Sequence, residues 1–159
     1  MARILVAYYS RSGNTRQMAE AAARGAEEAG AAVTLKAAAT VTPDDLLAHD
    51  GIMVGSPTYY GGMAWEVKKM FDDSVKVHRK LEGKVGAAFS TSANIGGGNE
   101  TTNLAIIQAM LIHGMIVPGI PLGDHYGPVG INAPDDRALT QARHLGKRVA
   151  VLAQQLFPA

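Results

Sequence analysis

The sequence predicts an α/β protein in which five parallel strands form one sheet with helices on both of its faces. Two observations predict this fold. Short apolar segments of strand length alternate along the chain with helical segments. The first of the apolar segments is continuous, as in a strand that is buried on both faces. The length of 159 residues favours a single domain, residues 1–159.

Five segments are expected to be strands. The first covers 3–9 and the second, which has a weaker pattern, covers 32–37. The third covers 51–56 and is expected to end at Pro57. The fourth is expected at 83–91, and a short fifth strand at 115–117, after Gly114 has ended the preceding helix.

About five helices are expected between and after these strands. The first covers 14–29 and ends before Gly30, and a short second helix begins near Thr42, a typical capping residue. Each of the other three helices has one apolar side. In the third helix this side consists of Met63, Val67, Met70, Phe71 and Ser74. In the fourth, over 100–113, it consists of Leu104, Ile107 and Leu111, and in the last helix of Leu139, Ala142, Leu145, Val149, Leu152 and Leu156.

The composition excludes several classes of function. With 15 basic and 14 acidic side chains the net charge is +1, so a nucleic-acid partner is not expected. The absence of cysteine excludes disulfides, thiolate metal sites and cysteine nucleophiles. No metal is expected, because the histidines at 49, 78, 113 and 144 lack the spacing of metal ligands and are interpreted as solvated surface residues. The aspartate pairs at 44–45, 72–73 and 135–136 are interpreted as residues of helix ends.

The N-terminal segment indicates no targeting signal. The apolar stretch at 4–9 is too short for a signal peptide or a membrane span. A cytoplasmic location without a membrane span is therefore expected.

The loop after the first strand is predicted to bind phosphate. It reads S-R-S-G-N-T at 10–15 and joins a buried strand to a helix N-terminus, where free N–H groups and the helix dipole attract anions. Its hydroxyl and amide side chains add neutral donors, and Gly13 allows close approach of the backbone. The patterns GxxxxGK[ST] and GxGxxG are absent, which argues against a Mg–nucleotide site and a dinucleotide site. A capped helix with a polar loop is the alternative interpretation.

Two further loops are expected at the same edge of the sheet. The sequence G-S-P-T-Y-Y-G-G-M-A-W at 55–65 places two tyrosines where they can stack on a planar ligand, or simply pack on the rim. Trp65 fits a subunit contact as well as a ligand contact. The sequence F-S-T-S-A-N-I-G-G-G-N-E at 89–100 contains three consecutive glycines, which favour a loop shaped around a ligand or a flexible lid.

These three motifs resemble those of the flavodoxin-like superfamily, and they are most similar to the WrbA-type FMN-dependent NAD(P)H:quinone oxidoreductases. The resemblance covers nearly the whole chain and implies a flavodoxin-like three-layer sandwich with strand order 2-1-3-4-5 and non-covalently bound FMN. It places the FMN phosphate in the loop of Ser10, Arg11, Ser12, Gly13, Asn14 and Thr15; the isoalloxazine ring against Pro57, Thr58, Tyr59, Tyr60 and Gly61; and the ribityl chain and pyrimidine edge against Ser90, Thr91, Ser92, Asn94, Ile95, Gly96 and Gly97.

The resemblance also implies a reaction. NAD(P)H would pass a hydride to N5 of the flavin and leave, and a quinone would then take its place and receive two electrons. His125 and Tyr126 fall after the expected fifth strand, where related reductases often place a histidine or tyrosine beside the flavin. His125 is the candidate proton donor to the quinone, because histidine titrates near neutrality. A homo-oligomer, either a dimer or a tetramer, is also expected.

Three alternative functions were compared with the sequence, and one of them remains open. A flavodoxin-type electron carrier remains the main alternative, although carriers of that family are strongly acidic and this chain is not. A receiver-type signalling domain is disfavoured because Tyr8-Tyr9-Ser10 stands where acids would be needed. A partner-binding module that has lost its flavin is disfavoured by the intact first loop.

Overall fold

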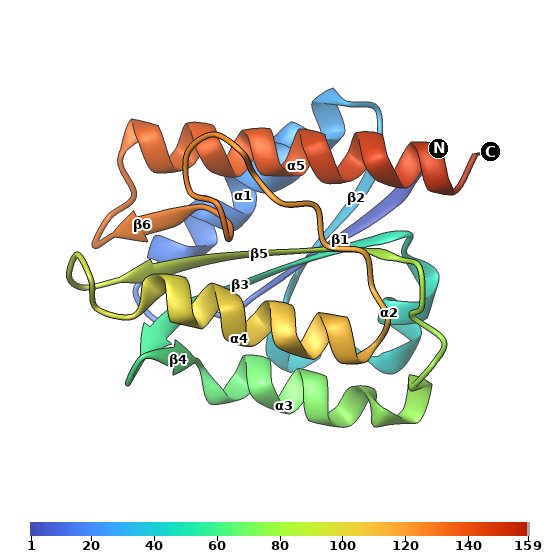
Figure 1. The fold of residues 1–159 in the computed structure, drawn as a ribbon, viewed down its shortest axis with the longest axis horizontal. Coiled ribbons are helices and arrows are strands. Elements are labelled where there is room, and N and C mark those ends of the chain that lie inside the picture. The colour runs from blue at the N-terminus through green and yellow to red at the C-terminus, as the bar shows by residue number, and fades with distance from the viewer. Residues whose placement is uncertain (159) are drawn as a thin grey trace.

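The computed structural model describes residues 1–158 and shows a central sheet between two layers of helices (Figure 1). Five parallel strands lie in the order β2-β1-β3-β5-β6, which is the predicted order 2-1-3-4-5. The strands are β1 (Arg3–Tyr8), β2 (Ala32–Ala37), β3 (Gly51–Tyr59), β5 (Val85–Ser92) and β6 (Val129–Ile131); a two-residue strand, β4 (Gly62–Met63), pairs with β3 alone. The flavodoxin-like α/β architecture is therefore confirmed.

The helices divide between the two faces of this sheet. One face is covered by α1 (Asn14–Glu28) and α5 (Asp136–Leu156). The other is covered by α2 (Pro43–Ala48), α3 (Trp65–Asp73) and α4 (Asn99–Ile112), with the short 3-10 helices η1 (Ala38–Thr40) and η2 (Ser74–Val77). Both faces of β1 are buried, because Ile4 and Val6 point toward α1 and α5 whereas Leu5 and Ala7 point the other way. This explains why the first strand is apolar throughout.

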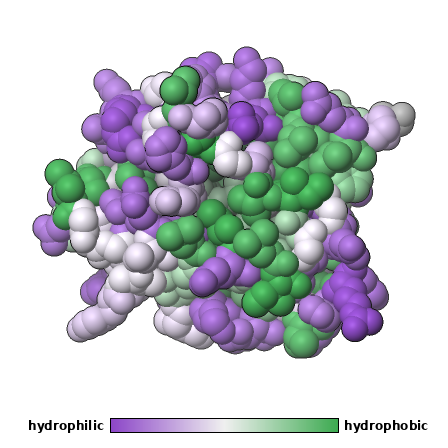
Figure 2. All heavy atoms as spheres, viewed as in Figure 1, coloured by the Kyte–Doolittle hydropathy of each residue, from purple (hydrophilic) through white to green (hydrophobic). Residues whose placement is uncertain are grey.

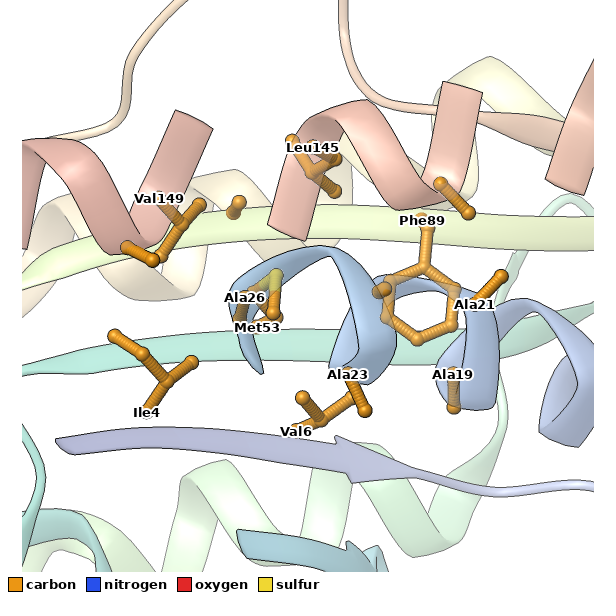
Figure 3. Close-up of a cluster of buried hydrophobic side chains, with 14 of the residues drawn as sticks. Ile4, Val6, Ala19, Ala21, Ala23, Ala26, Met53, Phe89, Leu145 and Val149 are labelled. Carbon is orange, nitrogen blue, oxygen red and sulfur yellow. The ribbon is translucent and has the colours of Figure 1, made fainter. Parts of the chain in front are cut away.

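The core beside α1 and α5 combines a few large side chains with many alanines. Figure 3 shows Phe89 and Met53, from the sheet, opposite alanines of α1 and Leu145 of α5. Two glycines bring these helices into backbone contact. A Cβ atom on Gly25 would lie 1.9 Å from the carbonyl oxygen of Arg143, and a Cβ on Gly146 would lie 1.9 Å from that of Ala22. At both positions, any larger residue would force the helices apart.

The third strand is longer than expected. It continues through Pro57 to Tyr59 because β1 pairs with β3 only as far as Gly55, and a proline fits a strand edge that has no neighbour. Tyr60 (φ 49°) and Gly61 (φ 77°) then form a two-residue turn with positive φ at both positions, which is typical of a tight hairpin. Met63 consequently belongs to β4 rather than to the following helix.

The fifth strand was predicted at the wrong place. At 115–117 only Ile116 pairs with the sheet, through an isolated bridge to Val85. Pairing resumes where Ser90 N–H donates to the carbonyl of Pro128, and β6 follows. The segment 118–128 therefore interrupts the strand, and Pro118 at its start has no N–H to continue the ladder.

The side of α4 that carries Leu104, Ile107 and Leu111 is not the core side: it lines a pocket beside the segment 117–127, and only Ile107 packs against the core. Leu111 is 57% exposed, whereas Ile106 and Met110 are completely buried against the sheet. The helix is apolar on both sides, so its sequence pattern does not distinguish the core side from the outer side.

Two histidines interpreted as solvated are in fact buried. The ring of His49 lies 2.6 Å (Nδ1) from the carbonyl oxygen of Asp45 and 2.9 Å (Nε2) from Oγ1 of Thr34. The Nε2 atom of His113 lies 2.7 Å from Oγ of Ser74, and burial lowers the pKa of His113. His49 joins the end of α2 to β2 and His113 joins the end of α4 to η2, roles that spacing along the sequence does not reveal.

Within residues 1–158, no helix is long and apolar enough to cross a membrane. In the same residues, no three histidine, aspartate or glutamate side chains are grouped so that they could bind a metal ion.

Asp45 at the start of α2 is expected to make the protein sensitive to acid. Burial raises the pKa of this carboxyl, but hydrogen bonds from Lys36 Nζ (2.6 Å) and Thr42 outweigh it and lower the pKa from 3.8 to about 2. A group whose pKa is lowered on folding stabilises the fold at neutral pH, here by about 2 kcal/mol, and that contribution disappears as the pH falls from about 5 to 2. In urea denaturation, Asp45→Asn should lower the free energy of unfolding at pH 7 and flatten its dependence on pH below 5.

Asp44→Asn is the matched control for Asp45, because Asp44 is exposed on the same turn and no hydrogen bond to Lys36 involves it. The control should keep the pH dependence of the natural protein. If the free energy of unfolding of the Asp45 variant depended on pH below 5 as steeply as that of the control, Asp45 would not be the source of the acid sensitivity.

Candidate functional site

The loops after β1, β3 and β5 meet at one edge of the sheet, at the left of Figure 1. The three strands are parallel neighbours, so their carboxyl ends open onto the same side. This is where ligands bind in open α/β sheets.

The first of these loops leaves two backbone donors free at the start of α1. Gly13 (φ 94°) caps the helix without a side-chain hydrogen bond, and Ser10 Oγ accepts the N–H groups of Gly13 (3.1 Å) and Arg16 (3.2 Å). Within residues 1–158, no hydrogen bond engages the N–H groups of Asn14 and Thr15, and the first turn carries no acid. Two free donors at the positive end of a helix dipole are suited to an anionic oxygen.

Thr15 also connects this loop to the third one. Its side chain is buried, and its Oγ1 lies 2.8 Å from Oγ1 of Thr91 near the end of β5. One of these hydroxyls donates to the other, so the pair retains one proton that can be donated elsewhere. The structure therefore brings together two predicted site residues from distant parts of the chain.

The second and third loops form one unit. A Cβ on Gly98, which has φ 101°, would lie 2.7 Å from Cα of Gly61. Thr101 Oγ1 lies 2.8 Å from the carbonyl oxygens of both Gly61 and Gly98, and Thr102 Oγ1, which donates to the carbonyl of Gly98, lies 3.1 Å from Thr58 Oγ1. The turn after β3 is thus fixed to the start of α4.

The aromatic side chains of the second loop stand at the open edge. Tyr60 is fully exposed, and Tyr59 packs edge-on against Tyr9 with ring centroids 6.4 Å apart. Pro57 lies behind them in β3, beside Thr91. Trp65, the first residue of α3, is mostly exposed, and no described contact decides between its two predicted roles.

The third loop is open to solvent over 93–97. Ser92 Oγ and Gly97 N–H both donate to the carbonyl of Asn94, and Ser90 Oγ donates to that of Asn99. The serine hydroxyls therefore donate within the protein and keep only acceptor capacity for a ligand. Ile95 in this loop is 89% exposed and adds apolar surface to it.

Tyr9 and Glu66 belong to the same region and were not singled out from the sequence. Burial and the nearby Glu66 carboxylate raise the pKa of Tyr9. The Oε2 atom of Glu66 is buried and has no hydrogen-bond partner among the described residues. Tyr9 was assigned to the first strand as an apolar residue, and no sequence pattern places Glu66 near it.

His125 and Tyr126 lie outside this group of loops, in the segment 118–128 that precedes β6. The Nδ1 atom of His125 lies 2.8 Å from the carbonyl oxygen of Ile120. Both residues line a pocket of about 240 Å³ together with the outer side of α4, and no residue of the three loops lines it. Their predicted role beside a flavin stays a prediction, and their expected position after the fifth strand is corrected.

Comparison with known proteins agrees with this fold and identifies a family. The model of the NADPH-dependent FMN reductase family matches residues 36–125, more than half of the chain. An NAD(P)H dehydrogenase (quinone) of Archaeoglobus fulgidus is 35% identical over 190 aligned positions, which cover 98% of this chain and 100% of the relative. A flavodoxin of Aquifex aeolicus is 38% identical, with 94% of this chain and 86% of the relative covered.

A solved structure supports the same relationship. The flavodoxin, WrbA-like protein from Agrobacterium tumefaciens is 33% identical to this chain, with a TM-score of 0.82 over 98% of this chain and 99% of that one. The alignment to the Archaeoglobus relative is longer than the 159 residues of this chain, so that relative contains inserted residues that are absent here. The chain belongs to the NADPH-dependent FMN reductase family.

Proposed function

We propose that the protein is an FMN-dependent NAD(P)H:quinone oxidoreductase and that residues 1–159 act as one FMN-binding domain. The observation that carries this proposal is the pair of free N–H groups at the start of α1, which lies at the same edge of the sheet as Tyr59, Tyr60 and the open loop 93–97. A phosphate ester fits this site, because its donors are neutral and no acid stands in the first turn. A planar ring fits the exposed tyrosines.

Each loop has a distinct task in this proposal. The N–H groups of Asn14 and Thr15 hold the phosphate, while Ser10 fixes the loop around it. Tyr59 and Tyr60 line the ring, and the backbone of 93–97 meets its polar edge. When bound, FMN supplies hydride and electron transfer between a reduced nicotinamide and a quinone. The exposed positions of Tyr60 and Ile95 leave room for the two substrates to bind in turn.

Absorption spectroscopy and steady-state kinetics test this function. The purified protein should bind FMN in preference to FAD and should oxidise NADH or NADPH in the presence of benzoquinone. FMN binding without quinone-dependent turnover would favour the electron carrier, an alternative that the Aquifex flavodoxin relative supports. Protein that gains no flavin spectrum on addition of FMN would contradict both.

His125 is proposed as the proton donor to the quinone. Its Nδ1 faces the carbonyl of Ile120, which fixes the ring, and in the imidazolium form Nε2 carries the proton that would pass to the quinone oxygen, leaving the neutral ring. Stopped-flow measurement of His125→Ala should show oxidation of reduced flavin by quinone slowed about 100-fold, with reduction by NAD(P)H unchanged. The control is His78→Ala, at another exposed histidine. Unchanged quinone turnover in the His125 variant would remove this residue from the mechanism.

The outer side of α4 supports the proposed homo-oligomer. Leu111 and Ile112 at the end of α4 and Ile116 in the segment that follows are exposed, and Figure 2 shows apolar surface continuing over both. Exposed apolar surface of this kind marks a contact site. Light scattering should report a dimer or tetramer that Leu111→Asp dissociates and that Gln108→Asp, on an exposed position of the same helix, leaves intact. The predicted cytoplasmic location stays a prediction.

A further inference from the structure

A groove of about 630 Å³ runs between α5 and the segment 118–122, away from the three loops of the proposed FMN site. Leu145, Val151 and Leu152 of α5 line one side, and the segment forms the other. Leu122 stands at its mouth with 86% of its surface exposed. Figure 2 shows apolar surface in this region, extending from α5 across the chain toward α4.

The wall of the groove is held in place without a ligand. Arg148 donates from Nη2 to the carbonyl of Gly119 (2.8 Å), which ties the segment to α5. Pro118 and Pro121 restrict the backbone on either side of this contact. Ile120 is anchored further by His125, whose backbone carbonyl accepts from the Ile120 N–H and whose ring Nδ1 lies 2.8 Å from the Ile120 carbonyl oxygen. Binding here would therefore require little ordering of the chain.

Positive charge lines one side of this apolar groove. Lys147 and Arg148 carry this charge, and His144, three and four residues before them, lies on the same side of α5. Within residues 1–158, no carboxylate lines the groove and no ion pair involves Lys147 or Arg148. Two other arginines of the same helix are paired, Arg137 with Asp124 and Arg143 with Glu28. Lys147 and Arg148 therefore differ from Arg137 and Arg143 of the same helix, because neither has an anionic partner among the described residues.

We propose that this groove binds a small amphipathic anion, an apolar chain or ring that carries one carboxylate. The apolar residues would cover the body of such a ligand, and Lys147 with its neighbours would face the carboxylate. The volume lies within the range typical of small-molecule sites. A nucleotide or other polyphosphate does not fit, because the lining is mainly apolar. The site is separate from that of FMN, since the two share no residue.

Calorimetric titration of the FMN-saturated protein with decanoate tests this proposal. Decanoate should bind with saturation at one site per chain, and 1-decanol, which has the same chain but no charge, should bind at least 10-fold more weakly. Lys147→Glu should weaken decanoate binding at least 10-fold. Lys80→Glu makes the same change of charge at an exposed position outside the groove and should leave the affinity unchanged.

Other outcomes would overturn the proposal. These are absence of saturable decanoate binding, equal affinity for decanol, or equal effects of the two lysine variants. A wild-type dimer that Leu122→Asp dissociates, with no decanoate binding to either form, would show that a second copy covers the groove. Lys147 is exposed, so its variant should keep the circular dichroism spectrum of the natural protein. Lys147→Gln should show an intermediate loss of affinity, because it removes the charge without reversing it.

Discussion

Replacement of Gly146 by alanine is expected to destabilise the protein by about 3 kcal/mol, the upper part of the range for an overpacked core. Helix propensity alone predicts the opposite, a gain of about 1 kcal/mol for alanine over glycine inside a helix. Packing decides the sign, because the new methyl group would lie 1.9 Å from the backbone oxygen of Ala22 in α1. Backbone cannot move aside as a flexible side chain can, so α1 and α5 must separate. Urea denaturation of Gly146→Ala measures the effect.

Gly25→Ala, on the other side of the same contact, should be destabilising to a similar extent, since its methyl group would meet the carbonyl of Arg143. Gly83→Ala is the control. Nothing lies within 4 Å of a Cβ at Gly83, so only its positive φ of 77° opposes alanine, at a cost of about 1–2 kcal/mol. A Gly146 variant as stable as the natural protein would show that the two helices are not held at backbone contact.

Introduction of an acid at position 12 is expected to have opposite effects on the fold and on FMN binding. In Ser12→Asp the carboxylate would lie beside the start of α1, where it interacts favourably with the helix dipole. The protein without FMN should therefore gain about 0.3–1 kcal/mol of stability. The same carboxylate would repel the FMN phosphate and compete for the free N–H groups of Asn14 and Thr15. We expect the affinity for FMN to fall by about 100-fold, equivalent to about 3 kcal/mol.

Ser12→Asn is the matched control, because its side chain has nearly the same shape and no charge. It should retain FMN affinity within a few fold. Flavin fluorescence titration gives the dissociation constants, and urea denaturation without FMN gives the stabilities. Equal FMN affinity in the Asp and Asn variants would place the phosphate elsewhere in the molecule. Such a result would contradict the assignment of the first loop while leaving the fold untouched.

Local rules were enough to predict most of the architecture. The apolar segment of β1 and the capping residue Thr42 each signal their element through neighbouring residues alone. The place of the site follows from topology, because parallel strands open their carboxyl ends on one side. Contacts between distant parts of the chain were not predictable in this way. The bond between Thr15 and Thr91 and the approach of Gly98 to Gly61 depend on the assembled fold.

The incorrect sequence predictions also concern features that depend on the assembled fold. Pro57 ends a strand only where its missing N–H would have faced a neighbour, and β1 stops at Tyr8 and so provides none there. The outer side of α4 is as apolar as its inner side, so periodicity cannot identify the core. The fifth strand is divided by the segment 118–128, and either of its two apolar parts fits the pattern of a strand.

This division of the fifth strand limits how copies of the protein can associate. A continuous edge strand would present a long row of unpaired N–H and C=O groups, onto which a strand of another molecule could add. Here that edge is reduced to a single bridge at Ile116 and the three residues of β6, with a looped segment between them. The sheet is therefore a poor template for growth on this side. Contact between copies here is left to side chains, which favours an assembly of defined size over an extended β-aggregate.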